Sequence, residues 1–293
     1  MSVVYQKKKE KQEKQEKQGE NDEEDENLDS EGFHVEYYLT PEQMREKLFF
    51  HSQLSEEVQD FEALKVTILQ LVQTGSVLSE SERKLLLQAF KNCVGSRRKA
   101  WRVLSQQERD LNSSDPLLPH LRLYKSEIEL EIEEVCKQML NAIYKLTIAP
   151  PHKPNIQLTT HEKVFYYKLQ GDYWRYLCEF RQGNQLEQSS REAEDAYNRA
   201  WEAVQGPLGL VPADPTLLGL ALNMSVFHYE ILGNRQTGLT LCRNVYNHAN
   251  SYLSNKNSNI DLDSNKIKNA NDVLKLLRDN LDLWERESAS NDR

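Results

Sequence analysis

RKLLLQAFKNCVGSRRKAWRVLS, residues 83–105, joins a helical repeat of apolar residues to a row of cations. Phe90 and Val94 recur at helical spacing, and the stretch contains no proline. Lys91 and Arg98 are seven residues apart, so a helix places both cations on one face. A cationic helix face alone is more often solvated, but an arginine set among apolar positions is typical of a positioned guanidinium. The stretch therefore predicts a long helix that carries a candidate anion-binding face.

The rest of the chain shows the same helical period between proline breaks. The nine prolines fall at only four places, and no segment alternates like a strand. Capping-box patterns begin at Thr40, Ser79 and Thr159, and short connections indicate antiparallel neighbours. We predict an all-α fold of nine antiparallel helices, over residues 41–57, 60–74, 80–111, 117–147, 160–182, 186–205, 215–232, 236–253 and 265–287.

The charge of the chain is concentrated at its N-terminal end. The 293 residues carry 37 Lys and Arg against 46 Asp and Glu, a net charge of −9. Residues 1–32 hold 6 of the lysines and 11 of the acids, and they contain few apolar residues that could repay the cost of ordering. We expect residues 1–32 to be a disordered tail and 33–293 to be one helical domain. Within that domain we expect a mobile loop at 254–264 and a short disordered C-terminus at 286–293.

Signatures of catalysis and of metal binding are absent from the sequence. The four cysteines are at least 42 residues apart, the histidines are scattered, and no phosphate-binding glycine loop or nucleophile motif occurs. We therefore expect no enzyme activity, cofactor or metal. No apolar stretch is long enough to span a membrane, and the acidic balance disfavours nucleic acid, so we expect neither partner. The cytoplasm is the expected location, with the nucleus as a second compartment.

A second cationic helix repeats the pattern of the first. In residues 164–180, VFYYKLQGDYWRYLCEF, Lys168 and Arg175 are again seven apart, with Tyr176 beside the arginine. Glu179, one turn after Arg175, is the expected partner of its guanidinium.

Two further helices carry an apolar stripe interrupted by an asparagine. Such a stripe is usually core, but two helices with the same arrangement suggest a groove whose amides suit an extended peptide backbone. The two stripes consist of Leu222, Asn223, Val226 and Glu230, and of Leu276, Asn280, Leu283 and Trp284.

These blocks, together with LGLALNMSVFHYEIL (218–232) and LLRDNLDLW (276–284), resemble the 14-3-3 family. The resemblance runs from about residue 42 to 285, in order and with compatible spacing. It implies nine antiparallel helices that form a concave cup with an amphipathic groove. It also implies an adaptor that binds phosphoserine or phosphothreonine peptides of client proteins in an extended conformation.

The resemblance assigns a role to each candidate residue. The phosphate pocket matches Lys91, Arg98, Arg175 and Tyr176. The residues that hold the peptide backbone match Asn223 and Asn280. The groove wall matches Leu222, Val226, Leu276, Leu283 and Trp284, with Lys168 and Glu230 as further polar lining.

The chain departs from the family where family dimers form salt bridges. Asp60 and Ala63 stand at the bridge-forming positions of the second helix, and Glu127 and Glu131 are their matching partners on the fourth. The usual Arg–Glu pair becomes Asp60 against Glu131. Like charges across an interface disfavour association, so we expect the homodimer typical of the family to be weak, rearranged or absent. The alternative is a dimer held by apolar contacts alone.

Two other functions remain open at this stage. One is a helical scaffold that binds unphosphorylated partners through the groove or its outer faces, with altered or lost dimerisation, and the other is an enzyme with an unrecognised site. The acidic run at residues 20–31 is also a candidate internal competitor for a basic groove.

Overall fold

The computed structural model describes residues 39–75, 77–147, 158–205, 209–255 and 262–291, and within these ranges every regular element is helical. The helices form one compact unit that begins at Thr40. The expected tail (1–32) and residues 256–261 of the expected mobile loop lie outside the described residues.

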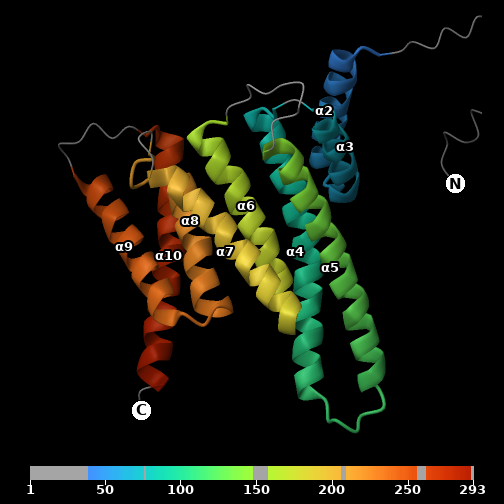
Figure 1. Cartoon of the computed structure of the whole chain (residues 1–293), viewed down its shortest axis with the longest axis vertical. Coiled ribbons are helices and arrows are strands. Elements are labelled where there is room, and N and C mark those ends of the chain that lie inside the picture. Colours follow the sequence, from blue (N-terminus) through green and yellow to red (C-terminus); the bar gives the residue numbers. More distant parts are fainter. Residues whose placement is uncertain (1–38, 76, 148–157, 206–208, 256–261, 292–293) are drawn as a thin grey trace, which may run out of the picture. The chain divides into compact units, whose positions relative to one another are not determined.

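The helices of Figure 1 follow the expected pattern closely. Nine α-helices and one π-helical segment are present in the described part of the chain. They are α2 (Pro41–Glu57), α3 (Phe61–Gln73), α4 (Glu80–Asp110), α5 (Leu118–Thr147), α6 (Thr160–Cys178), α7 (Gly183–Gln205), α8 (Pro215–Val226), η1 (Phe227–Ile231), α9 (Arg235–Ser254) and α10 (Ser264–Asn291).

Capping determines where several helices begin. Thr40, Ser79 and Thr159 each form a complete capping box, as the sequence predicts. At Ser79 the backbone N–H donates to the Glu82 carboxylate at 2.7 Å, while the Glu82 N–H donates to the serine hydroxyl at 3.3 Å. Because these bonds satisfy N–H groups that have no partner inside the helix, they fix the first turn of α4.

Several helix boundaries differ from expectation. Helix α6 ends at Cys178 rather than at residue 182, and α7 begins at Gly183 rather than at residue 186. The predicted helix 215–232 changes at Phe227 from α-helix to the π-helical η1, which the apolar period does not reveal. The last helix continues through residue 286 to Asn291, so the expectation of disorder from residue 286 does not fit the structure.

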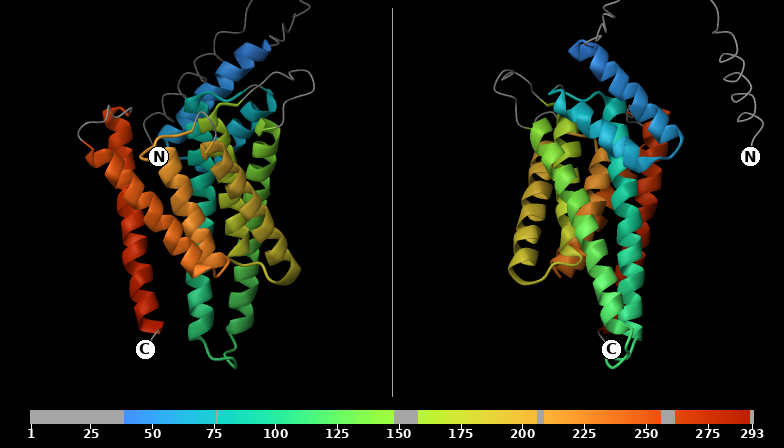
Figure 2. Two further views of the ribbon diagram at one scale, coloured as in Figure 1. Left: turned by 60° about the vertical axis from the view of Figure 1, so that its left-hand side comes forward. Right: turned by 90° about the vertical axis from the view of Figure 1, so that its right-hand side faces the viewer.

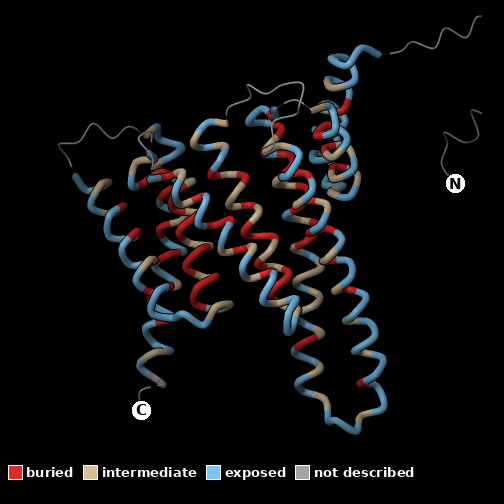
Figure 3. The backbone as a smooth tube through the Cα atoms, viewed as in Figure 1, coloured by how far each residue is buried: buried red, intermediate tan, exposed pale blue. Residues whose placement is uncertain are grey.

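Neighbouring helices run side by side in the order of the chain (Figure 2). Helices α4 and α5 form a long hairpin, α6 packs along α7, and α8 lies against α9 and α10. Most of the buried apolar residues, among those coloured red in Figure 3, belong to three clusters. The first joins α2 to α6, the second joins α8 to α10, and the third fills the space between α6, α7 and α8. Helix α6 contributes residues to the first and to the third cluster, so it connects them.

Candidate functional site

The predicted phosphate-binding residues lie on α4 and α6, and three of them form one stack. The guanidinium carbon of Arg98 lies 3.8 Å from the centre of the Tyr176 ring, and that of Arg175 lies 4.8 Å from it. Two cations on one aromatic ring repel each other, so the arrangement needs nearby carboxylates to be stable.

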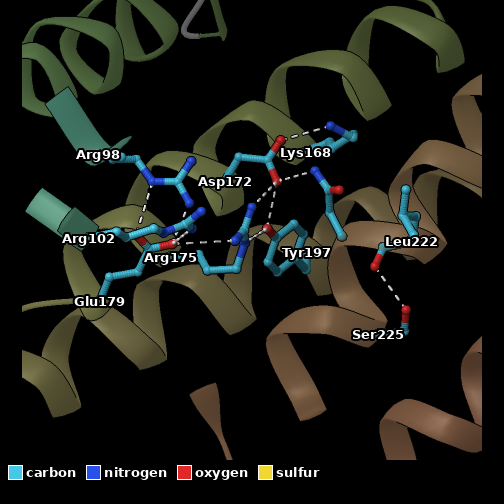
Figure 4. Close-up of polar contacts among 10 residues, drawn as sticks. Arg98, Arg102, Lys168, Asp172, Arg175, Glu179, Tyr197, Leu222 and Ser225 are labelled. Atoms are coloured by element: carbon cyan, nitrogen blue, oxygen red, sulfur yellow. Dashed lines mark hydrogen bonds and ion pairs between the residues drawn. The ribbon is translucent and has the colours of Figure 1, made fainter. Parts of the chain in front are cut away.

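Glu179 is one of these carboxylates. Its Oε2 accepts from Nε of Arg98 at 3.0 Å, and its Oε1 accepts from Nη2 of the same arginine (Figure 4). Arg175 approaches Glu179 only to 4.0 Å. The expected pairing of Glu179 with Arg175 is present as a long ion pair, and the closer contacts of the carboxylate hold the fork of Arg98 on α4.

Arg102 joins the same carboxylate and was missed by the sequence reasoning. Its Nη2 lies 3.2 Å from Glu179, and its side chain is 60% exposed. It follows Arg98 by four residues, so the helical spacing that linked Lys91 to Arg98 could have identified it. Lys91 is exposed and, among the described residues, forms no ion pair. Both side chains are available to an anionic ligand.

Arg175 is buried and is held by groups on two helices. Its Nε donates to the Tyr197 hydroxyl on α7 at 3.2 Å, and its Nη2 lies 3.9 Å from Asp172. Burial by itself would lower the pKa of Arg175, but Tyr197 and Asp172 outweigh it and raise the pKa above its ordinary value. This arginine is charged at every pH at which the protein is folded.

Asp172 is the second carboxylate of the site, and the sequence reasoning did not identify it. The side chain is buried, and it accepts from Lys168 Nζ at 2.7 Å, from the Tyr197 hydroxyl at 2.6 Å and from Asn223 Nδ2 at 2.6 Å. Burial alone would raise the pKa of Asp172, but Lys168 and Arg175 lower it below its ordinary value. Asp172 thus brings Lys168 and Asn223, both predicted to line the groove, to the edge of the arginine stack.

The site has a surplus of positive charge. Four cations (Arg98, Arg102, Lys168 and Arg175) are linked to two carboxylates, Asp172 and Glu179, which leaves two positive charges before Lys91 is counted. Two buried or half-buried arginines in a low-dielectric setting attract an anion more strongly than surface lysines do. The chemistry that fits is a doubly charged anion with several acceptor oxygens.

The predicted wall residues divide into exposed and buried members. Leu276 and Leu283 on α10 are 51% and 47% exposed, and Glu230 is exposed on η1. Leu222 and Val226 on α8 and Asn280 on α10 are half-buried, and α10 packs against α8.

Trp284 does not line an open surface. Only 2% of it is exposed, and its ring stacks on Tyr229 at 4.3 Å between centroids. The expected position of Trp284 in the groove wall is corrected accordingly: the indole is core that joins α10 to η1.

Two of the departures at the expected dimer surface, Asp60 and Glu131, have hydrogen-bond partners within the chain. Asp60 caps α3 by accepting from the Ala63 N–H at 3.0 Å. Glu131 accepts from Nε of Arg97 at 2.8 Å, and Arg97 also pairs with Glu62. Glu127 is exposed. The charge of Glu131 is therefore partly neutralised, whereas that of Asp60 faces solvent.

Other chemistry finds no support among the described residues. Burial raises the pKa of the Cys93 thiol to about 11 and that of Cys136 to about 12, so neither is a nucleophile at neutral pH. Within the ranges that the structure covers, no group of three or more His, Cys, Asp and Glu side chains could hold a metal ion. None of the described helices is both long and apolar enough to cross a membrane.

Comparison with known proteins identifies the family of the chain. The family model described as 14-3-3 protein matches residues 51–285. The mouse and human proteins named 14-3-3 protein theta are each 35% identical over 203 residues, which cover 69% of this chain and 80% of theirs. The Xenopus laevis 14-3-3 protein beta/alpha-A is 32% identical over 205 residues, or 70% of this chain and 81% of its own. Together with the all-helical fold, these matches show that the chain belongs to the 14-3-3 family.

Proposed function

We propose that this protein-binding adaptor recognises segments of client proteins that carry phosphoserine or phosphothreonine. The observation that supports this most is the stack of Arg98 and Arg175 on Tyr176, with Arg102 and Lys91 on the same helix as Arg98. A phosphorylated side chain brings about −1.5 to −2 charges and three acceptor oxygens, which matches the surplus of cations. The proposal places binding in the cytoplasm, with the nucleus as a second compartment.

The neighbouring residues suit an extended peptide on either side of the phosphate. In this proposal the amides of Asn223 and Asn280 bind the peptide backbone, because an amide offers both a donor and an acceptor to a peptide group. Leu276 and Leu283 present apolar surface to client side chains. By holding such a segment, the adaptor regulates the activity, interactions or location of its client.

A charge reversal in the pocket tests the proposal. Lys91→Glu removes a donor and adds repulsion, so we expect fluorescence anisotropy to show at least about a tenfold loss of affinity for an Arg-x-x-pSer-x-Pro peptide. The matched control is Lys137→Glu on α5, which changes the net charge equally at an exposed lysine paired with Glu133. The control should bind normally. Normal binding by Lys91→Glu would show that the pocket is assigned to the wrong residues.

A further inference from the structure

A continuous chain of hydrogen bonds runs from the phosphate pocket to Asn223. Arg175 Nε donates to the Tyr197 hydroxyl at 3.2 Å, and that hydroxyl donates to Asp172 Oδ1 at 2.6 Å. The same oxygen accepts from Asn223 Nδ2 at 2.6 Å. Figure 4 shows the contacts among Arg175, Tyr197 and Asp172. Three helices, α6, α7 and α8, are therefore joined through polar atoms at one point.

The residues of this hydrogen-bonded chain lie inside the protein. Tyr197 is fully buried, Asp172 is 3% exposed and Arg175 is 9% exposed. A hydrogen bond in such surroundings is stronger than the same bond in water, and an unpaired group there is costly. Each member consequently constrains the position of the next.

The contact with Asp172 decides how Asn223 is oriented. A carboxylate can only accept, so the amide must direct its NH₂ group toward Asp172 and cannot rotate by half a turn. This leaves the amide oxygen and the second N–H for other partners. Tyr197 acts on Arg175 in the same way, because its hydroxyl takes the Nε–H and leaves the ends of the guanidinium for the pocket.

Gly171 leaves the space that the ring of Tyr197 occupies against α6. A Cβ at residue 171 would lie 2.6 Å from Cε1 of Tyr197, closer than any stable contact. Helix α6 therefore needs a glycine where the Tyr197 ring packs, one residue before Asp172.

We propose that Asp172 and Tyr197 are positioning residues that join the phosphate pocket and the backbone-binding amide of Asn223 into one unit. Neither is required to touch the ligand; each sets the geometry of a neighbour that does. This inference rests on the proposed phosphopeptide function, and it predicts that the two kinds of recognition depend on one another.

Asp172→Asn tests the first positioning residue. The substitution keeps the size of the side chain but removes the charge and allows Asn223 to rotate. We expect at least about a tenfold loss of affinity for the phosphopeptide by fluorescence anisotropy. Phenyl phosphate, which has no peptide groups, should lose affinity by a clearly smaller factor in a phosphorus NMR titration, because Asp172 contacts Asn223 directly but reaches Arg175 mainly through Tyr197. Equal weakening toward both ligands would indicate a merely structural role and would overturn the inference, as would unchanged peptide binding.

Tyr197→Phe tests the second residue without removing a charge. We expect it and Asn223→Ala each to weaken phosphopeptide binding, and the double variant to lose at least about threefold less than the product of the two losses. Tyr229→Phe is the matched control, because its hydroxyl bonds Glu287 instead, and its effect should multiply independently with that of Asn223→Ala. Independent effects of Tyr197→Phe and Asn223→Ala would contradict the coupling.

The wild-type protein separates the two proposals. Equal binding of phosphorylated and unphosphorylated peptide by the wild type would contradict the proposed function, and this inference with it. A clear phosphate preference combined with independent effects in the double variant would overturn this inference alone.

Discussion

At the scale of single residues, the site depends on the two arginine forks that share the ring of Tyr176. Arg98 combines a two-point contact with Glu179 and a position over the ring. Lysine has the same charge but neither the planar fork nor the stacking surface. We expect Arg98→Lys to weaken phosphopeptide binding by about tenfold or more, although the net charge is unchanged.

The measurement is an anisotropy titration with Arg243→Lys on α9 as control. Arg243 also pairs with a glutamate, Glu285, but its side chain is 47% exposed. Comparable affinities of Arg98→Lys and the wild type would show that charge alone attracts the ligand and that the fork is irrelevant.

His228 gives the protein a stability that depends on pH. The side chain is buried, and its Nδ1 has no hydrogen-bond partner among the described residues. Burial lowers the pKa of His228, although Glu194 partly opposes this. Below about pH 6.5 the unfolded chain therefore binds a proton at His228 more readily than the folded protein does. The free energy of unfolding decreases as the pH falls below this value.

We expect His228→Phe to abolish this part of the pH dependence. Thermal melts at about pH 7.5 and about pH 5.5 should show that the difference in Tm between variant and wild type grows as the pH falls. If the difference in Tm between His228→Phe and the wild type were the same at both pH values, the pH dependence could not come from His228.

The sequence predicted more of the cations of the candidate site than of its carboxylates, although it missed Arg102. Arg98, Arg175 and Tyr176 could be selected because cations at helical spacing within apolar surroundings are unusual. Asp172 could not, since an acid inside a candidate anion site contradicts simple charge reasoning until its four neighbours are known. The sequence predicts Trp284 in the groove wall, because a periodic pattern shows which face of a helix a residue occupies. It does not show how deeply that residue is buried.

At the scale of elements, local signals placed most helix ends within a few residues. Capping boxes and prolines act within one turn, so they can be read directly from the sequence. The π-helical η1 could not be predicted, because its apolar period matches that of an α-helix, and α9 packs closely beside it. A Cβ on Gly238 of α9 would lie 2.7 Å from the carbonyl oxygen of Ser225 and 3.0 Å from Cβ of Tyr229.

This close approach makes Gly238 a structural requirement. We expect Gly238→Ala to lower the free energy of unfolding by about 1–3 kcal/mol, because the added methyl group forces the α9 backbone away from η1. Gly95→Ala in α4 is the matched control. A Cβ there meets nothing within 4 Å, so it should raise the free energy of unfolding by about 0.5–1 kcal/mol through helix propensity. Urea unfolding measures the free energy of unfolding of both variants. Destabilisation by Gly95→Ala without destabilisation by Gly238→Ala would contradict the requirement for a glycine at residue 238.

At the scale of the whole molecule, the net charge of −9 gives the wrong impression of the binding site. Residues 1–32 account for a net −5 of it, and the rest of the chain carries only −4. The cations on α4 and α6 are close together, and local arrangement rather than net charge determines the field that a ligand meets. An acidic protein can therefore present a phosphate-binding surface.

Self-association is the other property of the whole molecule. Phe50 and Leu54 on α2 and Val58 at its C-cap repeat every four residues and are 57%, 44% and 72% exposed, which is typical of a protein-interaction face. Asp60 lies directly after this stripe, and we expect its charge to oppose the pairing typical of the family. We expect Asp60→Asn to strengthen self-association severalfold in sedimentation equilibrium, because asparagine removes the charge and still caps α3. A tight dimer of the wild type, or no response to the substitution, would contradict the expected weakening.

The central claim is that the phosphate itself is recognised, and one comparison tests it most directly. The wild-type protein is titrated into two fluorescent peptides that share an Arg-x-x-Ser-x-Pro sequence and differ only in phosphorylation of the serine. Several charge-assisted hydrogen bonds, each contributing about 1.5–3 kcal/mol, predict that the phosphorylated peptide binds at least about a hundredfold more tightly. Equal affinity for the two peptides would contradict the account and would favour a helical scaffold for unphosphorylated partners.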